Sequence, residues 1–235
     1  MLLEQIIKDI KSKKELKDID DGFVKKRVLD YIKKNNINLE DEKIKKTKKF
    51  KLMFKEIRKR LRDVYGVFRQ VKDIRDKLVY KKIFEFIKDC NSILDIGCGE
   101  DCRDYLDNKK EYYLCDIDVN LIKYLNEFIK KQGFKGKAFV FNVVDDNLNE
   151  LPKTDAVFLL RSLEGFEVFE KNISYRLLNE LKCKKIIVSF SKVTLSHKRT
   201  IRKVGRIWFR RILNKLDYDY EIVNFDKEIL FLINK

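Results

Sequence analysis

The stretch LDIGCG, residues 94–99, places an acid and two glycines directly after a short apolar run. The spacing is Asp-x-Gly-x-Gly, formed by Asp95, Gly97 and Gly99. Glycine lets a backbone turn tightly and approach a ligand closely, and the loop after a parallel strand lies at the sheet edge where ligands bind. A dinucleotide-binding loop would need a third glycine at Cys102. The pattern therefore indicates a nucleoside ligand without a pyrophosphate.

Acidic residues follow the next two apolar runs. Asp116 ends the run YYLCD and could accept hydrogen bonds from both hydroxyls of a ribose, a device that nicotinamide enzymes also use. Ile117, which follows it, is also a candidate for binding the cofactor. Asp145 and Asp146 follow the third run, and either could accept from an adenine amino group. The glycine loop resembles that of S-adenosylmethionine-dependent enzymes, so the three sites together predict S-adenosylmethionine as the cofactor.

The elements that must position these residues are strands alternating with helices. Short apolar runs predict five parallel strands, at 92–96, 112–116, 138–143, 155–160 and 185–190. The end of the chain predicts an antiparallel hairpin of strands 220–225 and 228–233. The predicted fold class is α/β, a class I methyltransferase (Rossmann-like) sheet with a C-terminal antiparallel hairpin, preceded by an all-helical domain.

Before residue 90 the apolar spacing is helical, with helices predicted near 22–35, 41–63 and 73–89. A further helical pattern covers 119–131, and another covers 200–213. We expect two domains, a basic helical RNA-binding domain at 1–70 and a methyltransferase domain at 71–235.

Positive charge is concentrated at the two ends of the chain, which has 235 residues and a net charge of +16. Residues 1–90 hold 28 basic and 16 acidic side chains, residues 91–190 hold 15 and 17, and residues 191–235 hold 11 and 5. A neutral centre between basic flanks favours a polyanionic partner over a merely soluble lysine-rich surface. The predicted RNA contacts are Lys48, Lys51, Lys55 and Lys59 in the first flank, and Lys198, Arg199, Arg202, Lys203 and Arg206 in the second.

The acceptor chemistry is read from what the strand ends contain. No Pro-Cys or Thr-Cys stands at the tip of the fourth or fifth strand, where methylation of a pyrimidine carbon would need a cysteine nucleophile. The segment LLRSLEGFE replaces the Asp/Asn-Pro-Pro-aromatic loop that serves exocyclic amines. A ring nitrogen with a free lone pair, such as guanine N7, needs no base. We assign no catalytic residue, and Arg161, Ser191 and Lys192 are candidates for orienting the substrate.

Four stretches resemble the aminoglycoside-resistance 16S rRNA (guanine-N7) methyltransferases and their relatives. They are KRLRDVYGVF (59–68), LDIGCG, DAVFLLRSLEGFE (155–167), and VSFSKVTLSHK with the later WF and EILFLINK. The resemblance covers nearly the whole chain, and ordinary methyltransferases lack its first and last stretches. It implies an S-adenosylmethionine-dependent RNA methyltransferase that acts on a base nitrogen of small-subunit ribosomal RNA.

The same resemblance implies roles for individual residues. Gly99, Asp116, Asp145 and Leu160 match positions that contact the cofactor, and Phe68 matches an aromatic residue that closes over it. Lys77 matches the arginine that pairs with the cofactor carboxylate, with Arg75 as the alternative. The chain departs from the family in the loop expected to face the target base, at Ser191, at Val193 and at 196–198.

Other features bound the cellular setting. The five cysteines form no CxxC pair and His197 is the only histidine, which argues against a zinc site. No apolar run approaches the roughly 18 residues that span a bilayer. We expect a soluble, cytoplasmic, monomeric protein whose partner is ribosomal RNA or the small ribosomal subunit. The alternatives are another RNA such as tRNA, another base atom, or a non-catalytic RNA-binding protein with a vestigial methyltransferase fold.

Overall fold

The chain forms two compact units in the computed structural model, which describes residues 2–66, 75–193 and 206–235. The helical unit comprises Met1–Lys72 together with the short segment Ile117–Val119. The sheet unit comprises Asp73–Asp116 and Asn120–Lys235. The units thus separate two residues beyond the boundary expected from the sequence, and the segment at 117–119 was not expected in the first of them.

The helical unit consists of amphipathic helices, some of which are capped at their starts by side chains. Its elements are α1 (Leu2–Lys11), η1 (Lys14–Leu16), α2 (Asp21–Lys34), η2 (Glu42–Lys46), α3 (Lys48–Leu61) and η3 (Arg62–Gly66). The Asp20 carboxylate accepts from the Phe23 amide at 2.8 Å, and the Thr47 hydroxyl accepts from the Phe50 amide at 3.2 Å. Such caps satisfy amides that have no partner within the helix. One face of each helix is buried, which leaves the other free for charged side chains.

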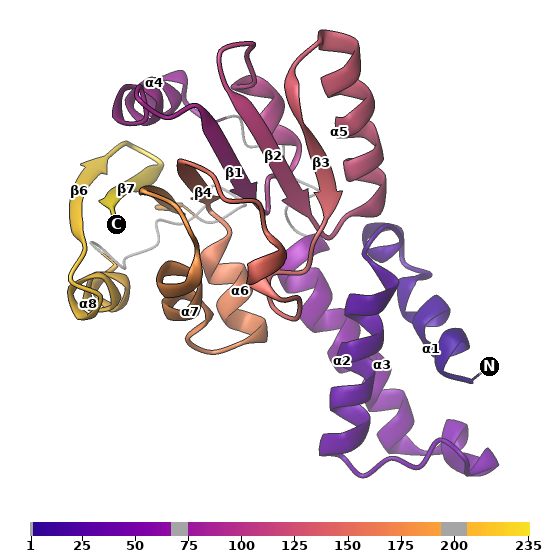
Figure 1. Cartoon of the computed structure of the whole chain (residues 1–235). Coiled ribbons are helices and arrows are strands. Elements are labelled where there is room, and N and C mark those ends of the chain that lie inside the picture. The colour runs from indigo at the N-terminus through magenta and orange to yellow at the C-terminus, as the bar shows by residue number, and fades with distance from the viewer. Residues whose placement is uncertain (1, 67–74, 194–205) are drawn as a thin grey trace. The chain divides into compact units, whose positions relative to one another are not determined.

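The sheet unit has seven strands in the order β3-β2-β1-β4-β5-β7-β6 (Figure 1). The strands are β1 (Ser92–Ile96), β2 (Glu111–Asp116), β3 (Lys135–Val140), β4 (Ala156–Leu160), β5 (Lys185–Ser191), β6 (Asp219–Asn224) and β7 (Glu228–Asn234). The first five are parallel, whereas β7 runs antiparallel to both β5 and β6. This is the predicted α/β class with its terminal hairpin, and the fold prediction is confirmed.

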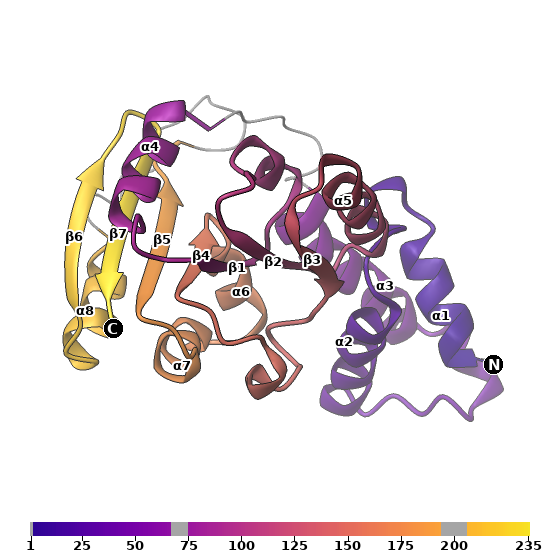
Figure 2. The same ribbon diagram turned by 45° about the horizontal axis from the view of Figure 1, so that its top comes forward.

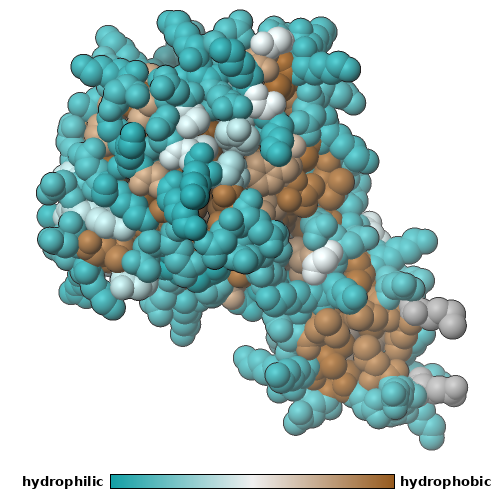
Figure 3. Space-filling model, viewed as in Figure 1, coloured by the Kyte–Doolittle hydropathy of each residue, from teal (hydrophilic) through white to brown (hydrophobic). Residues whose placement is uncertain are grey.

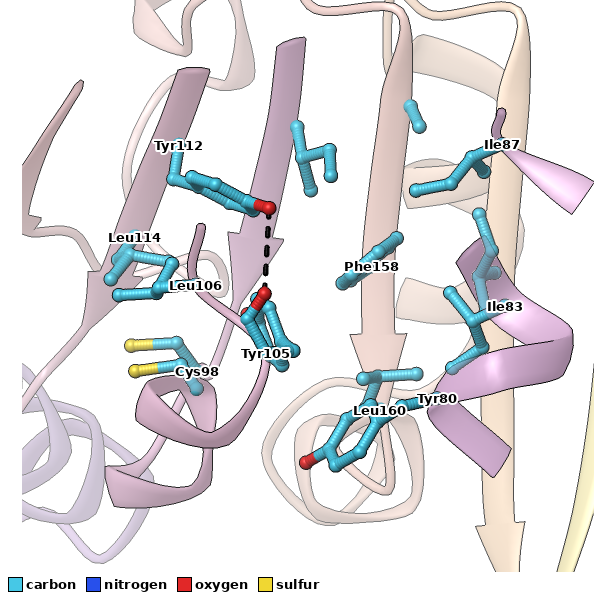
Figure 4. Close-up of a cluster of buried hydrophobic side chains, with 14 of the residues drawn as sticks. Tyr80, Ile83, Ile87, Cys98, Tyr105, Leu106, Tyr112, Leu114, Phe158 and Leu160 are labelled. Atoms are coloured by element: carbon cyan, nitrogen blue, oxygen red, sulfur yellow. Dashed lines mark hydrogen bonds between the residues drawn. The ribbon is translucent and has the colours of Figure 1, made fainter. Parts of the chain in front are cut away.

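Helices cover both faces of the sheet (Figure 2). The helical elements of this unit are α4 (Lys77–Phe86), η4 (Glu100–Asp104), α5 (Val119–Gln132), η5 (Leu148–Glu150), α6 (Leu163–Phe169), α7 (Ile173–Glu180) and α8 (Ile207–Lys215). Helices α4 and α5 lie on one face, and α6, α7 and α8 lie on the other. Beneath α4 the aromatic rings of Tyr80, Tyr105, Tyr112 and Phe158 pack into one buried cluster (Figure 4).

The third strand lies earlier than the sequence predicts. It spans Lys135–Val140 and pairs with β2 along its whole length, whereas the apolar run indicated 138–143. Because β3 is an edge strand, its first residues are exposed and give no apolar signal. Phe141, Val143 and Val144 are buried although they lie in the loop beyond the strand. The apolar run therefore continues past the end of the strand, because residues of the following loop are also buried.

The topology fixes where a ligand can bind. Chain order reverses between β1 and β4, because β1 continues to β2 on one side and pairs with β4 on the other. Ligands of open α/β sheets bind outside the carboxyl ends of the strands at such a point. Among the described residues, no helix combines the length and the apolar character that crossing a membrane requires.

Candidate functional site

The glycine turn after β1 folds back onto the end of β2. The amides of Gly97 and Cys98 both donate to the Cys115 carbonyl, at 2.8 and 3.2 Å. Gly97 has φ 72° and Gly99 has φ 56°, a region that side chains disfavour. A β-carbon on Gly97 would lie 3.1 Å from the β-carbon of Ser162, so the turn also packs tightly against the second residue after β4.

Gly99 opens onto free space. A β-carbon built there would meet no heavy atom within 4 Å, while its amide lies 3.4 Å from a carboxylate oxygen of Asp116. Asp116 is the last residue of β2 and is half-buried. Backbone donors, an acceptor carboxylate and an open cradle at one strand end fit the sugar and base of a nucleoside cofactor. Ile117 follows and is buried, and it is grouped with the helical unit.

Asp95 lies inside the sheet unit, with 2% of its surface exposed. The Tyr105 hydroxyl donates to its carboxylate, while the other carboxylate oxygen is buried without a hydrogen-bond partner. Burial raises the pKa of Asp95 to about 7, against the lowering effects of the Tyr105 hydrogen bond and of the positive charge of Arg75. Asp95 thus anchors the strand that precedes the glycine turn, and the positive charge of Arg75 acts on the Asp95 carboxylate.

The loop after β3 presents two carboxylates that differ in their attachments. The backbone amide of Asn142 donates to Asp146 at 2.8 Å, and the side-chain amide of Asn142 donates to Asp145 at 2.6 Å. Arg176 of α7 donates to the carbonyls of Val143 and Val144, at 3.0 and 3.1 Å. These bonds hold the loop in place, and both acids remain candidates for the adenine amino group.

Three charged side chains meet at the ends of β4 and β7. Arg75 donates to both carboxylate oxygens of Glu228, at 3.2 and 3.1 Å, and Arg161 donates to one of them at 2.6 Å. We call Arg75, Glu228 and Arg161 the arginine node. Leu160, the last residue of β4, directly precedes Arg161 in the sequence and is buried. Lys77, by contrast, is the first residue of α4 and is exposed. The geometry therefore favours Arg75 over Lys77 as the cation that would pair with the cofactor carboxylate.

The two other substrate candidates at the end of β5 are tied to neighbouring backbone. The Ser191 hydroxyl donates to the Val193 carbonyl at 2.7 Å, and the Lys192 ammonium donates to the Phe225 carbonyl at 2.7 Å. The Lys192 amide also donates to the Lys227 carbonyl at 2.7 Å. Lys192 therefore holds the strand end against the hairpin turn, whereas the Ser191 hydroxyl holds the backbone that directly follows β5.

Arg206 is not at the surface, contrary to the prediction that it contacts RNA. Only 2% of it is exposed, because its guanidinium pairs with Glu164 at 2.9 Å and donates to the Ser191 carbonyl at 2.7 Å. It also lies over the ring of Phe190, 5.1 Å from the ring centre. Its role in the structure is to join β5, α6 and α8.

The predicted basic face of α3 is exposed. Phe50, Met53, Ile57 and Leu61 form the buried side of this helix. Four ammonium groups project from the rest of it, and within the described residues none forms an ion pair; they belong to Lys48, Lys51, Lys55 and Lys59. Glu56, the acid of this helix, interacts with the Tyr31 hydroxyl. Figure 3 shows a mainly hydrophilic face with an apolar area on the helical unit.

The remaining predicted residues lie outside the described part of the chain. They are Phe68, Lys198, Arg199, Arg202 and Lys203. Their roles stay predictions. In the described ranges, no three histidine, cysteine or acidic side chains come together as a metal site, and the five cysteines are free thiols.

Comparison with known proteins shows which solved structures share this fold. No protein-family model matches the sequence. The chain is 24% identical over 123 residues to a 16S rRNA (guanine(1405)-N(7))-methyltransferase of Micromonospora echinospora, a match that covers 51% of this chain and 44% of that protein. The resemblance to the 16S rRNA methyltransferases is confirmed.

Two solved structures show the same fold over the whole chain. The 16S rRNA methyltransferase RmtF, in complex with S-adenosyl-L-homocysteine, has a TM-score of 0.74 at 17% identity and covers 99% of this chain and 98% of its own. The 16S rRNA methylase RmtB has a TM-score of 0.73 at 15% identity, with the same coverage. The likeness to the 16S rRNA methyltransferase fold thus extends through both units.

Sequence reasoning missed Glu228 and Tyr105, although each holds a predicted residue in place. Glu228 did leave a signal, since it is an acid at the start of a strand whose next five residues are apolar. An acid in a buried strand needs cationic partners. Tyr105 left none, because nothing in its spacing from Asp95 points to a hydrogen bond.

Proposed function

We propose that the protein transfers a methyl group from S-adenosylmethionine to a base nitrogen of small-subunit ribosomal RNA, with guanine N7 as the first candidate. The observation that carries this proposal is the open cradle above Gly99, faced by the Asp116 carboxylate at the reversal point of the sheet. The likeness to RmtF and RmtB over nearly the whole chain and the match to the Micromonospora enzyme support it.

The chain offers a holder for each part of the cofactor. Asp116 would accept from the ribose hydroxyls, Asp145 or Asp146 from the adenine amino group, and Leu160 would pack against the ligand at the end of β4. Arg75 would meet the carboxylate. When bound, S-adenosylmethionine supplies a methyl group on a positively charged sulfur, and the protein's task is to align the acceptor with it. Guanine N7 carries a lone pair and no proton, so this chain needs no general base for it.

Electrostatic attraction between lysine side chains and phosphate groups would hold the RNA. Four exposed ammonium groups on α3 favour a polyanionic partner, because none is neutralised by an acid in the described residues. Phosphate contacts position the substrate without reading its sequence. We further propose that the protein acts as a monomer in the cytoplasm, where its substrate would be the small ribosomal subunit.

Cofactor binding is tested by calorimetric titration of S-adenosylmethionine. We expect binding to the native chain and at least a tenfold weaker affinity for Asp116→Ala. Asp219→Ala, which removes an exposed carboxylate from the edge strand β6, is the matched control and should bind normally. A native chain that binds no cofactor would show that the fold is vestigial and that the protein is no methyltransferase.

The acceptor is tested by incubating the protein and cofactor with small ribosomal subunits, followed by mass spectrometry of the nucleosides. The expected product is a single methylated guanosine whose methyl group is on N7. A methyl group at another position of the base would support the methyltransferase activity and contradict N7 as the acceptor atom. Methylation of tRNA and not of the subunit would contradict ribosomal RNA as the substrate and would identify tRNA in its place.

A further inference from the structure

The short segment that follows strand β2 belongs to the helical unit, although the residues on both sides of it belong to the sheet unit. The segment is Ile117–Val119, and two backbone hydrogen bonds hold it within the helical unit. The Asp20 amide donates to the Ile117 carbonyl at 2.9 Å, and the Val119 amide donates to the Asp18 carbonyl at 3.0 Å. We call these two hydrogen bonds the clasp.

The clasp has the geometry of a short piece of antiparallel sheet. Ile19 and Asp118 lie opposite each other in an antiparallel bridge. Ile19 and Ile117 are buried, with 1% and 6% of their surface exposed, so water has little access to the hydrogen bonds beside them. A buried amide or carbonyl that loses its partner is costly. The clasp therefore fixes a segment that, as a connection between a strand and a helix, would otherwise be free to move.

One side of the clasp adjoins the carboxylate that faces the open cradle. Asp116 is joined to Ile117 by a peptide bond, and its carboxylate lies 3.4 Å from the Gly99 amide. The Asp116 carbonyl accepts from the Phe141 amide at 3.1 Å. The backbone of Asp116 is thus held by the Phe141 bond and, through the next residue, by the clasp. Together they restrict where the carboxylate can lie.

The other side of the clasp is built from helix starts. The Asp20 carboxylate accepts from the Phe23 amide at 2.8 Å, and the Asp20 carbonyl accepts from the Val24 amide at 3.3 Å, so the start of α2 fixes this residue. Val119 is the first residue of α5, and amides of a first helical turn have no partner within the helix. The Asp18 carbonyl supplies that partner.

We propose that the clasp is a positioning element of the cofactor site, in which the amides of Asp20 and Val119 hold the backbone after Asp116 so that its carboxylate is preset for the ribose of S-adenosylmethionine. A group that is already held in its binding position loses less freedom when the ligand binds, which raises the affinity. This inference rests on the proposed function and gives the helical unit a part in cofactor binding. Both amides act through Asp116, since a carbonyl of the clasp already engages each of them.

Val119→Pro removes one clasp bond and changes little else. Proline has no amide hydrogen and suits the first position of a helix. Asp118 lies in the extended bridge, a conformation that suits the residue before a proline. Val119→Ala keeps the amide and is the matched control. In calorimetric titration, we expect Val119→Pro to bind S-adenosylmethionine about five- to tenfold more weakly than the native chain, and Val119→Ala to bind it within about twofold of the native affinity.

Two further measurements distinguish positioning from a general loss of structure. Without cofactor, both variants should bind small ribosomal subunits as the native chain does, because the exposed lysines of α3 are unchanged. In a double variant, Val119→Pro should add no loss of cofactor affinity to that of Asp116→Ala, because the clasp acts through the Asp116 carboxylate.

Hydrogen exchange in the native chain tests the clasp without any substitution, and it decides the matter if Val119→Pro does not fold. Saturating S-adenosylmethionine should slow the exchange of the Asp20 and Val119 amides at least about fivefold, because the cofactor favours the state in which the clasp is closed. The Thr47 amide donates to the Ile44 carbonyl at 3.0 Å elsewhere in the helical unit. Its exchange should be the same with and without cofactor.

The outcomes separate this inference from the proposed function. A native chain that binds no S-adenosylmethionine contradicts the proposed function. If the native chain binds it, equal affinities of Val119→Pro and Val119→Ala, or an additive loss in the double variant, overturn the positioning role. Weaker binding of both cofactor and subunits by Val119→Pro also overturns it, because the clasp then serves the structure in general. Unchanged exchange of the Asp20 and Val119 amides on saturation would show that the clasp is not linked to the cofactor.

Discussion

Tyr105 donates its hydroxyl hydrogen to the buried carboxylate of Asp95, directly behind the glycine turn. The bond joins the element after that turn to the strand before it. Because burial raises the pKa of Asp95 to about 7, the carboxyl group releases its proton near neutral pH while it stays buried. The support of the cofactor turn is therefore sensitive to pH.

Stability should fall as the pH rises from 5 to 8. Below pH 4, Asp95 is protonated in the folded and the unfolded chain alike. Between about pH 4 and 7 it ionises only in the unfolded chain, which lowers the free energy of unfolding, and above pH 7 the effect is complete. Urea unfolding of the native chain and of Asp95→Asn should show their difference changing by about 3 kcal/mol between pH 5 and pH 8. A difference that stays constant with pH would contradict the raised pKa.

Gly99→Ala should damage cofactor binding more than folding. Gly99 and Gly133 both have positive φ, 56° and 69°, and both face open space, but only Gly99 lies at the cradle. Alanine should lower the free energy of unfolding by about 1 to 2 kcal/mol at Gly133, because positive φ is costly for it, and by about 1 to 3 kcal/mol at Gly99, whose ψ of −168° lies in a region that glycine alone commonly adopts. Only Gly99→Ala should weaken S-adenosylmethionine binding, by at least tenfold in calorimetry. Equal losses of cofactor affinity in the two variants would contradict the proposal that the cofactor binds at Gly99.

The double variant Lys51→Gln, Lys55→Gln should bind small ribosomal subunits more weakly. Both residues are exposed on α3, and glutamine keeps the helix propensity while removing two charges. The slope of log affinity against log salt should become shallower by about 1.4 to 1.8. Lys130→Gln, Lys131→Gln on α5 changes the charge equally and serves as the control. If both pairs lower affinity alike, the effect reflects net charge and not the α3 face.

Arg206→Gln should unfold at a lower temperature. The side chain is buried against Phe190, paired with Glu164 and bonded to Ser191, so its loss leaves polar groups without partners. Breaking such a pair costs about 2 to 4 kcal/mol in the free energy of unfolding. Glu164→Gln, whose site is 42% exposed, should cost less. A variant of unchanged stability but reduced RNA affinity would restore the RNA contact predicted from the sequence.

Local signals were enough to predict the sheet and its glycine turn. The run SILDI matches β1 residue for residue, because a central parallel strand is buried on both faces and reads as a continuous apolar segment. Gly97 and Gly99 take the positive φ that their positions suggested. The edge strand β3 was misplaced because it has no buried face along its first half.

Long-range pairings could not be predicted in this way. Glu228 and Arg75 are separated by 153 positions, and Arg206 and Glu164 by 42. Arg206 stands among basic residues and looks like a solvent-facing cation in the sequence. Only the packing of α8 against β5 reveals that it is enclosed, since burial of a single side chain depends on elements that local periodicity does not relate.

The burial of the thiols has a practical consequence for spectroscopy. Cys90, Cys98, Cys102 and Cys115 are buried, and burial also raises the pKa of the half-buried Cys183 to about 12. Maleimide dyes react with thiolates, so the native chain should stay almost unlabelled at neutral pH. A cysteine introduced on the exposed side of α3 would then accept a fluorophore selectively, and none of the five natural sulfur atoms would have to be replaced first.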